Sequence, residues 1–315
     1  MLKQHNNYPN KFQQYGGLVV LPNTGKLYIA SDFHARYTDF NKWLSKTGVV
    51  DDIQDDKDIY VFLNGDIVDI KPDDKFAQKN GDTKIIKKIR EIQSFENGNR
   101  FIYGLGNHED ETIRTYAELT QFLTRNYFSD DINSIKSMIF LNKSDNHIKN
   151  FNFIKRIDSV IANYLEQLPI AILTKNGLVA THAGPSQSLN SPENIMAKEL
   201  GVIQEITWGR PNAPDVNGKI YAGDYTNQDI SDFLRQMNNS KVLVSGHTPV
   251  NLIHPDFLYD GFDVACIGDQ IIHSTSYGSV EPDTGTHIEV DLSKPITSVS
   301  DLIPNTNLVN IKYNR

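Results

Sequence analysis

Short apolar runs rich in β-branched residues recur along the chain, and polar or helix-forming segments separate them. Their length and their polar boundaries predict buried β-strands. The runs are KLYIA (26–30), DIYVFL (58–63), RFIYGL (100–105), PIAIL (169–173), GLVAT (177–181), KVLVS (241–245) and QIIHS (270–274). Residues 82–95, 150–165 and 230–237 between them repeat apolar side chains at helical spacing. Strands alternating with helices predict an α/β fold.

The length of 315 residues and the hydrophobic content of 39% allow one large α/β domain with a sizeable core. We predict a single domain over residues 1–315, with a core over about 26–290. Residues 110–165 interrupt the strand–helix rhythm and are expected to form a helical insert. Residues 292–315 are expected to be an irregular tail.

Charge and hydropathy exclude two classes of partner. The formal net charge is −8 and no block of Lys and Arg stands out, so the attraction for phosphate backbones expected of a nucleic-acid-binding protein is missing. No apolar run approaches the roughly 20 residues of a membrane span, and residues 1–17 lack the apolar segment of a signal peptide. We expect a cytoplasmic protein without a nucleic-acid or membrane partner.

The chain has one cysteine, Cys266, so an intramolecular disulfide and a thiolate metal cluster are excluded. Cys266 lies in the apolar stretch FDVAC and is expected in the core. Any metal site must therefore use His, Asp, Glu or Asn.

Five of the predicted strands are each followed at once by residues that can bind metal. In an open α/β sheet the carboxyl ends of the strands line one crevice, so these clusters are expected to converge. A lone His at a strand end is more often structural, but five clusters in series favour a metal site. The clusters are Ser31–His34, Asn64–Asp69, Gly106–Glu109, Thr181–Gly184 and Ser245–Pro249.

The ligand types indicate the metal. Carboxylate, imidazole and amide together suit Mn²⁺, Fe²⁺ or Zn²⁺ and do not suit copper(I) or an iron–sulfur cluster. Two such ions about 3.5–4 Å apart that share a carboxylate can clamp and attack a phosphoryl group. Asp66 is the candidate for the shared carboxylate.

The ordered set Asp-x-His, Gly-Asp-x-x-Asp, Gly-Asn-His-Glu, His and Gly-His resembles the calcineurin-like metallophosphoesterase superfamily over roughly residues 26–290. The chain is most similar to the phosphoprotein (Ser/Thr) phosphatase branch, because of "GNHE", "LPIAILTKNGLVATHAG" (168–184) and "ITWGRP" (206–211). The resemblance implies an αββα sandwich of two mixed β-sheets flanked by helices, with a dinuclear metal site.

The resemblance also implies the roles of single residues. Asp32 and His34 would hold the first metal and Asp66 would bridge the two. The second metal would be held by Asn107, His182 and His247. Manganese is the expected metal, with Fe²⁺, Fe³⁺ or Zn²⁺ as alternatives.

For catalysis, the resemblance implies direct attack on phosphorus by a hydroxide that bridges the two metal ions. His108 would donate a proton to the leaving-group oxygen and would not bind metal. Asp69, three residues after Asp66, would orient His108 and raise its basicity.

The chain departs from the branch pattern in its arginines. Ile70 follows Asp69 and Leu105 precedes Gly106, where the branch has arginines that clamp phosphate. Replacements are expected among cations at the same rim, namely Arg36, Lys71 and Arg210. Tyr277, in "STSYG", is a further candidate for substrate binding. The alternative for each of these residues is an ordinary solvated or packed side chain.

We therefore predict a metal-dependent phosphatase that hydrolyses phosphomonoesters, with phosphorylated Ser, Thr or Tyr side chains of proteins as the first hypothesis. The substrate would be a phosphoprotein or a phosphorylated small molecule. The alternatives are hydrolysis of dinucleotide polyphosphates or other nucleotides, and an inactive scaffold that keeps the fold. Retention of His108, Asp69 and the ligand set argues against the scaffold.

Overall fold

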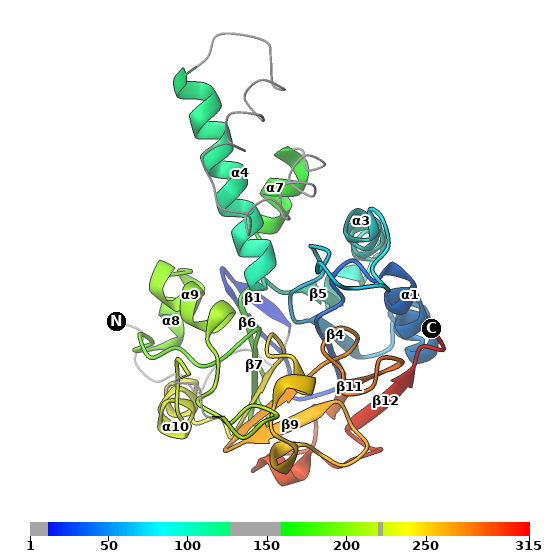
Figure 1. Ribbon diagram of the computed structural model, residues 1–315, viewed down its shortest axis with the longest axis vertical. Helices are drawn as coiled ribbons and strands as arrows, with labels where there is room; N and C mark the ends of the chain where they lie inside the picture. Colours follow the sequence, from blue (N-terminus) through cyan, green and yellow to red (C-terminus); the bar gives the residue numbers. More distant parts are fainter. Residues whose placement is uncertain (1–11, 127–158, 220–222) are drawn as a thin grey trace.

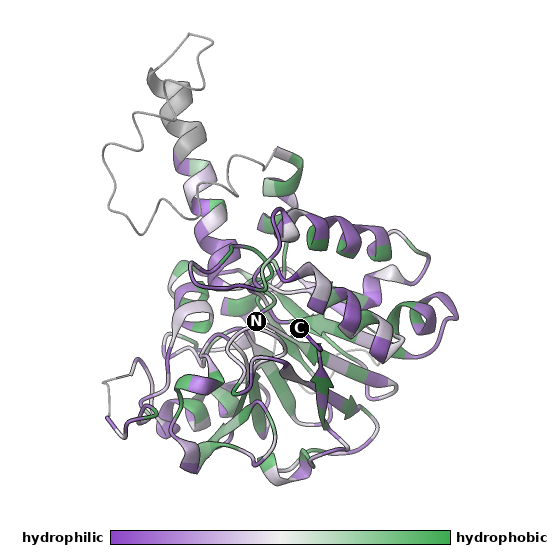
Figure 2. Ribbon diagram, turned by 45° about the vertical axis from the view of Figure 1, so that its right-hand side comes forward, coloured by the Kyte–Doolittle hydropathy of each residue, from purple (hydrophilic) through white to green (hydrophobic). Residues whose placement is uncertain are grey.

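The computed structural model describes residues 12–126, 159–219 and 223–315, which form two β-sheets between layers of helices (Figure 1). Hydrophobic residues concentrate in the strands and hydrophilic residues on the outer faces of the helices (Figure 2). This confirms the expected α/β class and the sandwich of two mixed sheets.

The larger sheet has seven strands in the order β1-β2-β6-β7-β8-β10-β9. β7, β8 and β10 run parallel, whereas β6 and β9 run antiparallel to β7 and β10. The strands are β1 (Gln13–Tyr15), β2 (Leu18–Val20), β6 (Ala171–Leu173), β7 (Leu178–Thr181), β8 (Val242–Ser245), β9 (Val264–Ile267) and β10 (Gln270–His273).

The smaller sheet has five strands in the order β12-β11-β3-β4-β5. β3, β4 and β5 are parallel, so their carboxyl ends reach the same edge. The strands are β3 (Lys26–Ala30), β4 (Ile59–Leu63), β5 (Phe101–Tyr103), β11 (Thr284–Asp291) and β12 (Leu308–Lys312). All seven apolar runs that the sequence singled out contain a strand.

Helices flank the sheets, with α1 and α3 on the side of the smaller sheet and α8, α9 and α10 beside the larger one (Figure 1). The α-helices of the described ranges are α1 (Tyr37–Thr47), α2 (Val49–Gln54), α3 (Gly81–Gln93), α4 (Asn107–Asn126), α7 (Ser159–Glu166), α8 (Pro192–Met196), α9 (Leu200–Trp208) and α10 (Asn227–Gln236). Short 3₁₀ helices are η1 (Gly98–Arg100), η3 (Val250–Leu252), η4 (Pro255–Phe257) and η5 (Val299–Asp301).

Successive side chains of a strand point to opposite faces of the sheet, and this alternation gives two separate hydrophobic cores. Leu27 and Ile29 of β3 belong to the cluster that also contains Val242 and Val244 of β8, so these side chains fill the space between the sheets. Tyr28 and Ala30 point to the other face and belong to the cluster formed with the helices. Both faces of the central strands are therefore buried, which explains why their sequences read as continuous apolar runs.

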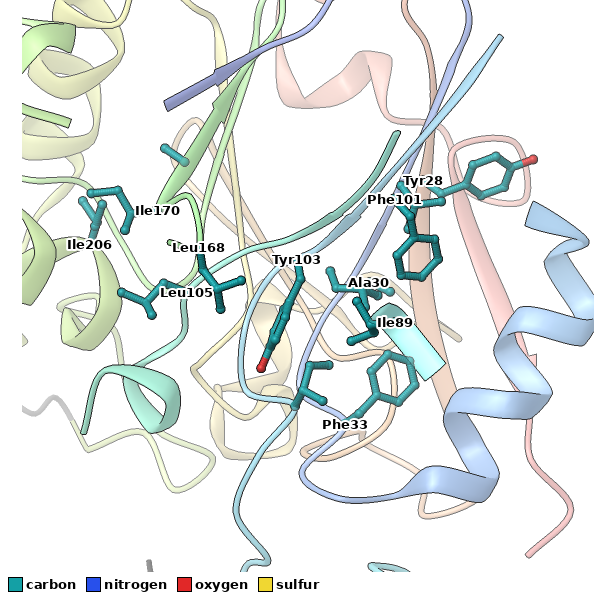
Figure 3. Packing of buried hydrophobic residues seen from close by; sticks show 14 of the residues in the cluster. Tyr28, Ala30, Phe33, Ile89, Phe101, Tyr103, Leu105, Leu168, Ile170 and Ile206 are labelled. Carbon is teal, nitrogen blue, oxygen red and sulfur yellow. The ribbon is translucent and has the colours of Figure 1, made fainter. Parts of the chain in front are cut away.

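The α3 helix shows the apolar stripe predicted for residues 82–95. Ile85, Ile89 and Ile92 are buried on one face of the helix. Figure 3 shows Ile89 near Phe33 and Phe101, members of the same buried cluster. This packing fixes α3 against the sheet whose strand ends carry the candidate metal ligands.

The predicted insert and tail have different outcomes. α4 and α7 overlap the two ends of the predicted insert at 110–165 and project beyond the sandwich (Figure 1), while residues 127–158 lie outside the described residues. The prediction of an irregular tail is wrong for residues 308–312, because β12 pairs with β11 along its whole length.

Among the helices of the described ranges, none combines the length and apolarity needed to cross a bilayer.

Replacing Ile89 with Ala should lower the free energy of unfolding by about 2–5 kcal/mol, because the change leaves a cavity in a fully buried position. Urea denaturation followed by circular dichroism measures this. The exposed neighbour Lys87, changed to Ala, is the matched control and should shift stability by less than about 0.5 kcal/mol. Equal effects of the two substitutions would contradict the assigned face of α3.

Candidate metal centre

Five loops at the carboxyl ends of β3, β4, β5, β7 and β8 bring the predicted ligands together. Because β3, β4 and β5 are parallel, and β7 and β8 are parallel, the residues that follow them reach one edge of the sandwich. All of the predicted ligands are buried in the described structure. They are Asp32, His34, Asp66, Asn107, His182 and His247.

The Asp66 carboxylate lies at the centre of the cluster. Its Oδ2 atom is 3.3 Å from Nε2 of His34, and its Oδ1 atom is 3.2 Å from Nε2 of His182. Two sets of potential ligand atoms, each within 4.8 Å of one another, share Asp66: one contains His34 and His108, and the other His182 and His247. A carboxylate shared by two sets is the arrangement that a bridged pair of metal ions requires.

The atoms around the Asn107 amide show whether these residues fit a cation. Its Oδ1 atom is 3.1 Å from Nε2 of His182 and 3.0 Å from Nδ1 of His247. The same position is 3.1 Å and 3.2 Å from the two Asp66 oxygens. Lone pairs of an amide, a carboxylate and two imidazoles thus face one another, which a divalent cation among them would stabilise. Without a cation, the amide turned by 180° would place its NH2 group, which has two N–H donors, within 3.2 Å of the same four atoms.

Asp32, predicted as a ligand of the first metal, lies beside His34, with its Oδ1 atom 3.9 Å from Nε2 of His34. Its Oδ2 atom accepts a hydrogen bond of 3.1 Å from the backbone N–H of His247. Asp32 therefore ties the loop after β3 to the loop after β8. Oxygen and nitrogen donors without sulfur fit the divalent ions expected from the sequence.

Burial and charge set the protonation of the cluster. Burial lowers the pKa of His34 to about 4 and lowers that of His247 well below its ordinary value, so both rings are neutral and able to ligate. Burial opposes protonation of His182 as well, but the Asp66 charge outweighs it and raises the pKa to about 9. A proton on His182 thus balances Asp66 in the protein without metal, and metal binding would release it.

The loops that carry the ligands have unusual backbone. Asp32, His34, Asp66, Asp69 and His247 all have positive φ, at 59°, 41°, 54°, 70° and 60°. Left-handed backbone at residues other than Gly costs of order 1 kcal/mol each. Its concentration here indicates that the chain is bent to aim these side chains inward.

Glu109 holds two of the loops together, a role that the sequence reasoning missed. Its carboxylate is fully buried and accepts hydrogen bonds from the backbone N–H groups of residues 66, 67, 68 and 106, at 2.8, 2.9, 3.1 and 2.9 Å. The Tyr103 hydroxyl donates a further one of 2.7 Å. Gly106 is required beside it, because a Cβ there would lie 2.4 Å from the Asp66 Oδ1 atom. The only signal in the sequence was the last letter of "GNHE".

His108 and Asp69 lie together at the edge of the cluster. Nδ1 of His108 is 3.0 Å from Oδ2 of Asp69, a hydrogen-bonding distance, although the contact is poorly aligned for a hydrogen bond. Nε2 of His108 is 3.9 Å from Oδ2 of Asp66. Burial opposes protonation of His108, but the Asp66 charge and the contact with Asp69 outweigh it and raise the pKa above its ordinary value. The pair can therefore hold a proton beside the metal ligands.

Tyr277 packs against the cluster, whereas Arg36 is engaged in other contacts. The Tyr277 ring stands edge-on to His34 with centroids 4.8 Å apart. Nε of Arg36 donates to Asp74 at 2.7 Å and Nη1 to the Ser276 carbonyl at 2.8 Å. Arg36 is buried by these contacts and is not a free phosphate ligand in this arrangement.

Two other cations, Lys71 and Arg210, suit phosphate binding better than Arg36 does. The Lys71 ammonium group contacts Nε2 of His108, the ring nitrogen that faces the cluster. Arg210 is exposed, and no side chain in the described part of the chain pairs with its guanidinium group. After burial, the charges of His182 and Arg210 are the main causes of the low His247 pKa, so Arg210 acts on the cluster. Cys266 lies on β9, half-buried against the inter-sheet core.

Comparison with known proteins identifies the class. Residues 25–251 match the family model of the calcineurin-like phosphoesterases. This match spans most of the chain, so the protein belongs to the calcineurin-like phosphoesterase family, a family of metallophosphoesterases. A search of curated proteins finds no match.

Solved structures share the fold. A protein serine/threonine phosphatase from Saccharomyces cerevisiae is 18% identical with a TM-score of 0.54, over 92% of this chain and 79% of that one. A putative diadenosine tetraphosphatase is 15% identical with a TM-score of 0.51, over 95% and 98%. A cold-active protein tyrosine phosphatase is 15% identical with a TM-score of 0.50, over 96% and 79%. At these identities the likeness is one of fold.

Replacing Glu109 with Gln should lower the free energy of unfolding by about 2–3 kcal/mol, because a buried charged acceptor with several donors is lost. It should also weaken manganese binding, since the loops of Asp66 and Asn107 are no longer tied. Denaturation and isothermal titration calorimetry measure the two effects. The exposed Glu96, changed to Gln, is the control. Unchanged manganese affinity in the Glu109 variant would contradict this role.

Proposed function

We propose that the protein is a metal-dependent phosphomonoesterase that acts on phosphorylated Ser, Thr or Tyr side chains of proteins. The observation that carries this proposal is the convergence of the ligand cluster around Asp66 with the His108–Asp69 pair beside it. The first group is suited to activating water against phosphorus, and the second to protonating a leaving oxygen.

The two sets of potential ligand atoms that share Asp66 support a proposal for the metal ligands. We assign Asp32, His34 and Asp66 to one ion, and Asp66, Asn107, His182 and His247 to the other. Divalent ions held there would supply Lewis-acid activation of water and would neutralise charge on the phosphoryl oxygens. Manganese is our first choice, and iron or zinc would accept the same donors.

The chain's own groups position the substrate and move the proton. His108 donates from Nε2, the nitrogen that faces the cluster, while Asp69 holds Nδ1 on the opposite side of the ring. The Lys71 ammonium group already contacts this nitrogen, and a phosphate dianion would draw it away as a counter-charge. Arg210 would meet the phosphate from the side of His247. Arg36 would act only indirectly, by supporting Tyr277.

Hydrolysis of dinucleotide polyphosphates is the second candidate, and the fold of the putative diadenosine tetraphosphatase supports it. The His108–Asp69 pair favours the first candidate. An alkoxide leaving from phosphoserine needs a proton, whereas a nucleotide leaves as a stable anion and needs an acid far less. An inactive scaffold is disfavoured, because both the ligands and the acid are present and converge.

Two finer assignments belong to this proposal. We propose a single domain over residues 1–315, supported by an inter-sheet core that contains Val19 near one end of the chain and Leu308 near the other. We also propose a cytoplasmic location, supported by the single cysteine in the sequence.

Phosphate release from phosphopeptides and from a dinucleotide tetraphosphate, each with added manganese, tests the function directly. The proposal predicts a higher kcat/KM for at least one of the phospho-Ser, phospho-Thr and phospho-Tyr peptides. A clear preference for the dinucleotide would support the second candidate. No turnover of either substrate in the metal-loaded protein would support the scaffold.

His108→Asn should lower kcat by about 10²–10⁴-fold, because the general acid is lost while the position keeps a polar, uncharged side chain. The loss should be larger for an alkyl phosphate than for an aryl phosphate, since phenoxide leaves with less protonation. Steady-state kinetics on both substrates and metal analysis measure this. Loss of one metal ion from the variant would instead make His108 a ligand, which its distance from Asp66 also allows.

The pH dependence should reveal the same acid. His108 is protonated below its raised pKa, so kcat should fall as pH rises through that value. Asp69 is one cause of the raised pKa, so in Asp69→Asn the alkaline limb of the kcat profile should move to lower pH. An alkaline limb at the same pH in both proteins would exclude His108 as the titrating acid.

A further inference from the structure

Residues 312–315 are clamped between α1 and the loop that carries Tyr277. The Lys46 ammonium group donates to the Lys312 carbonyl at 2.7 Å, and that of Lys42 donates to the Tyr313 carbonyl. The Tyr313 hydroxyl is fully buried and donates to the carbonyl of Thr275, two residues before Tyr277. The segment is therefore part of the folded structure on the side of the metal cluster.

Arg315 forms a buried ion pair with Asp39 of α1. Nε of Arg315 lies 3.1 Å from Oδ2 of Asp39, and Nη2 contacts the same oxygen. The two side chains are only 5% and 3% exposed, so the pair is almost completely removed from water. Asp39 Oδ2 also accepts a hydrogen bond of 2.7 Å from the Ser276 hydroxyl. This hydrogen bond links the ion pair to Ser276, the residue next to Tyr277.

A second buried ion pair lies beside the first. The Ser276 carbonyl accepts from Arg36, which pairs with Asp74. The ring of Phe76 lies beside both guanidinium groups, with the Arg315 Cζ atom 4.5 Å and the Arg36 Cζ atom 5.4 Å from its centroid. Three buried charged side chains, those of Arg36, Asp39 and Arg315, therefore contact Ser276. Asp74 is linked to Ser276 through Arg36.

These contacts continue to the metal ligands through Tyr277. The Arg36 Cζ atom lies 5.2 Å from the centroid of the Tyr277 ring, and that ring stands edge-on to His34. The backbone N–H of Tyr277 donates to the Asp32 carbonyl at 2.8 Å. Two first-metal ligands are thus in contact with the loop that the ion pairs hold.

Burying an ion pair gains little stability over an apolar pair of the same size, so stability alone does not account for two of them here. Such pairs can instead fix a single arrangement of the segments that they join. The segments joined here are α1, the loop of Asp74 and Phe76, the loop of Ser276 and Tyr277, and residues 312–315.

We propose that Arg315 is a positioning residue for the hydrolytic site: it holds Asp39 and Ser276 so that Tyr277 packs against His34 and borders the phosphate. The inference rests on the proposed function of the site. Arg315 does not touch the metal ligands, and its effect on the reaction passes through Tyr277.

A double-mutant cycle between Arg315 and Tyr277 tests this, with kcat and KM measured on an aryl phosphate. Arg315→Ala and Tyr277→Ala should each raise KM by about 5–10-fold with a smaller change in kcat. The double variant should be no worse than Tyr277→Ala alone, because Arg315 acts through Tyr277. Independent, additive effects would overturn the proposal, since a general structural role would produce them.

Two further variants are controls for effects of the substitutions on folding. Arg315→Lys keeps the charge next to Asp39 and should restore most of the KM. Arg315→Gln combined with Asp39→Asn removes both charges, so the protein folds without an unpaired buried carboxylate and should still show the raised KM. A normal KM in this double variant would overturn the proposal.

NMR of histidine-labelled protein gives a readout that does not depend on activity. The ring signals of His34 should shift in Arg315→Ala and in Tyr277→Ala, and should stay in place in Arg315→Lys. If the wild-type protein hydrolyses no phosphate ester, the proposed function fails while this readout still judges the inference. Unchanged His34 signals in Arg315→Ala would overturn the inference alone.

Discussion

The Asp66 carboxylate is buried between two imidazoles, and the rest of the site is arranged around it. Its oxygens lie 3.3 Å from His34 Nε2 and 3.2 Å from His182 Nε2, and the Asn107 amide faces both oxygens. Lone pairs that converge away from water repel one another unless a cation or a proton lies among them. Loops with left-handed backbone and the buried Glu109 hold this arrangement in place. Stability alone does not account for such an arrangement.

The sequence predicted the strands that position the site better than those that complete the sheets. KLYIA coincides with β3, and the other apolar runs each contain a strand, because central strands buried on both faces carry little polar sequence. β11 was missed although it is the longest strand in the described residues. Its sequence, TGTHIEVD, buries Thr286 and His287, so the hydrophobic pattern that identifies strands is broken.

The ligand cluster could be predicted because each ligand directly follows an apolar run, and topology then brings the strand ends together. Contacts between distant segments could not be predicted in this way. Arg36 looked like a phosphate ligand from its place two residues after His34, but it pairs with Asp74. Arg315 gave no signal at all, since only the fold reveals that it meets Asp39.

The central claim is that the cluster around Asp66 holds two divalent cations. Anomalous diffraction from a crystal grown with manganese, recorded at the manganese absorption edge, tests it most directly. The account predicts two peaks on either side of Asp66, one beside Asp32 and His34 and the other beside Asn107, His182 and His247. A cluster without peaks, with the Asn107 amide nitrogen turned toward Asp66, would contradict it.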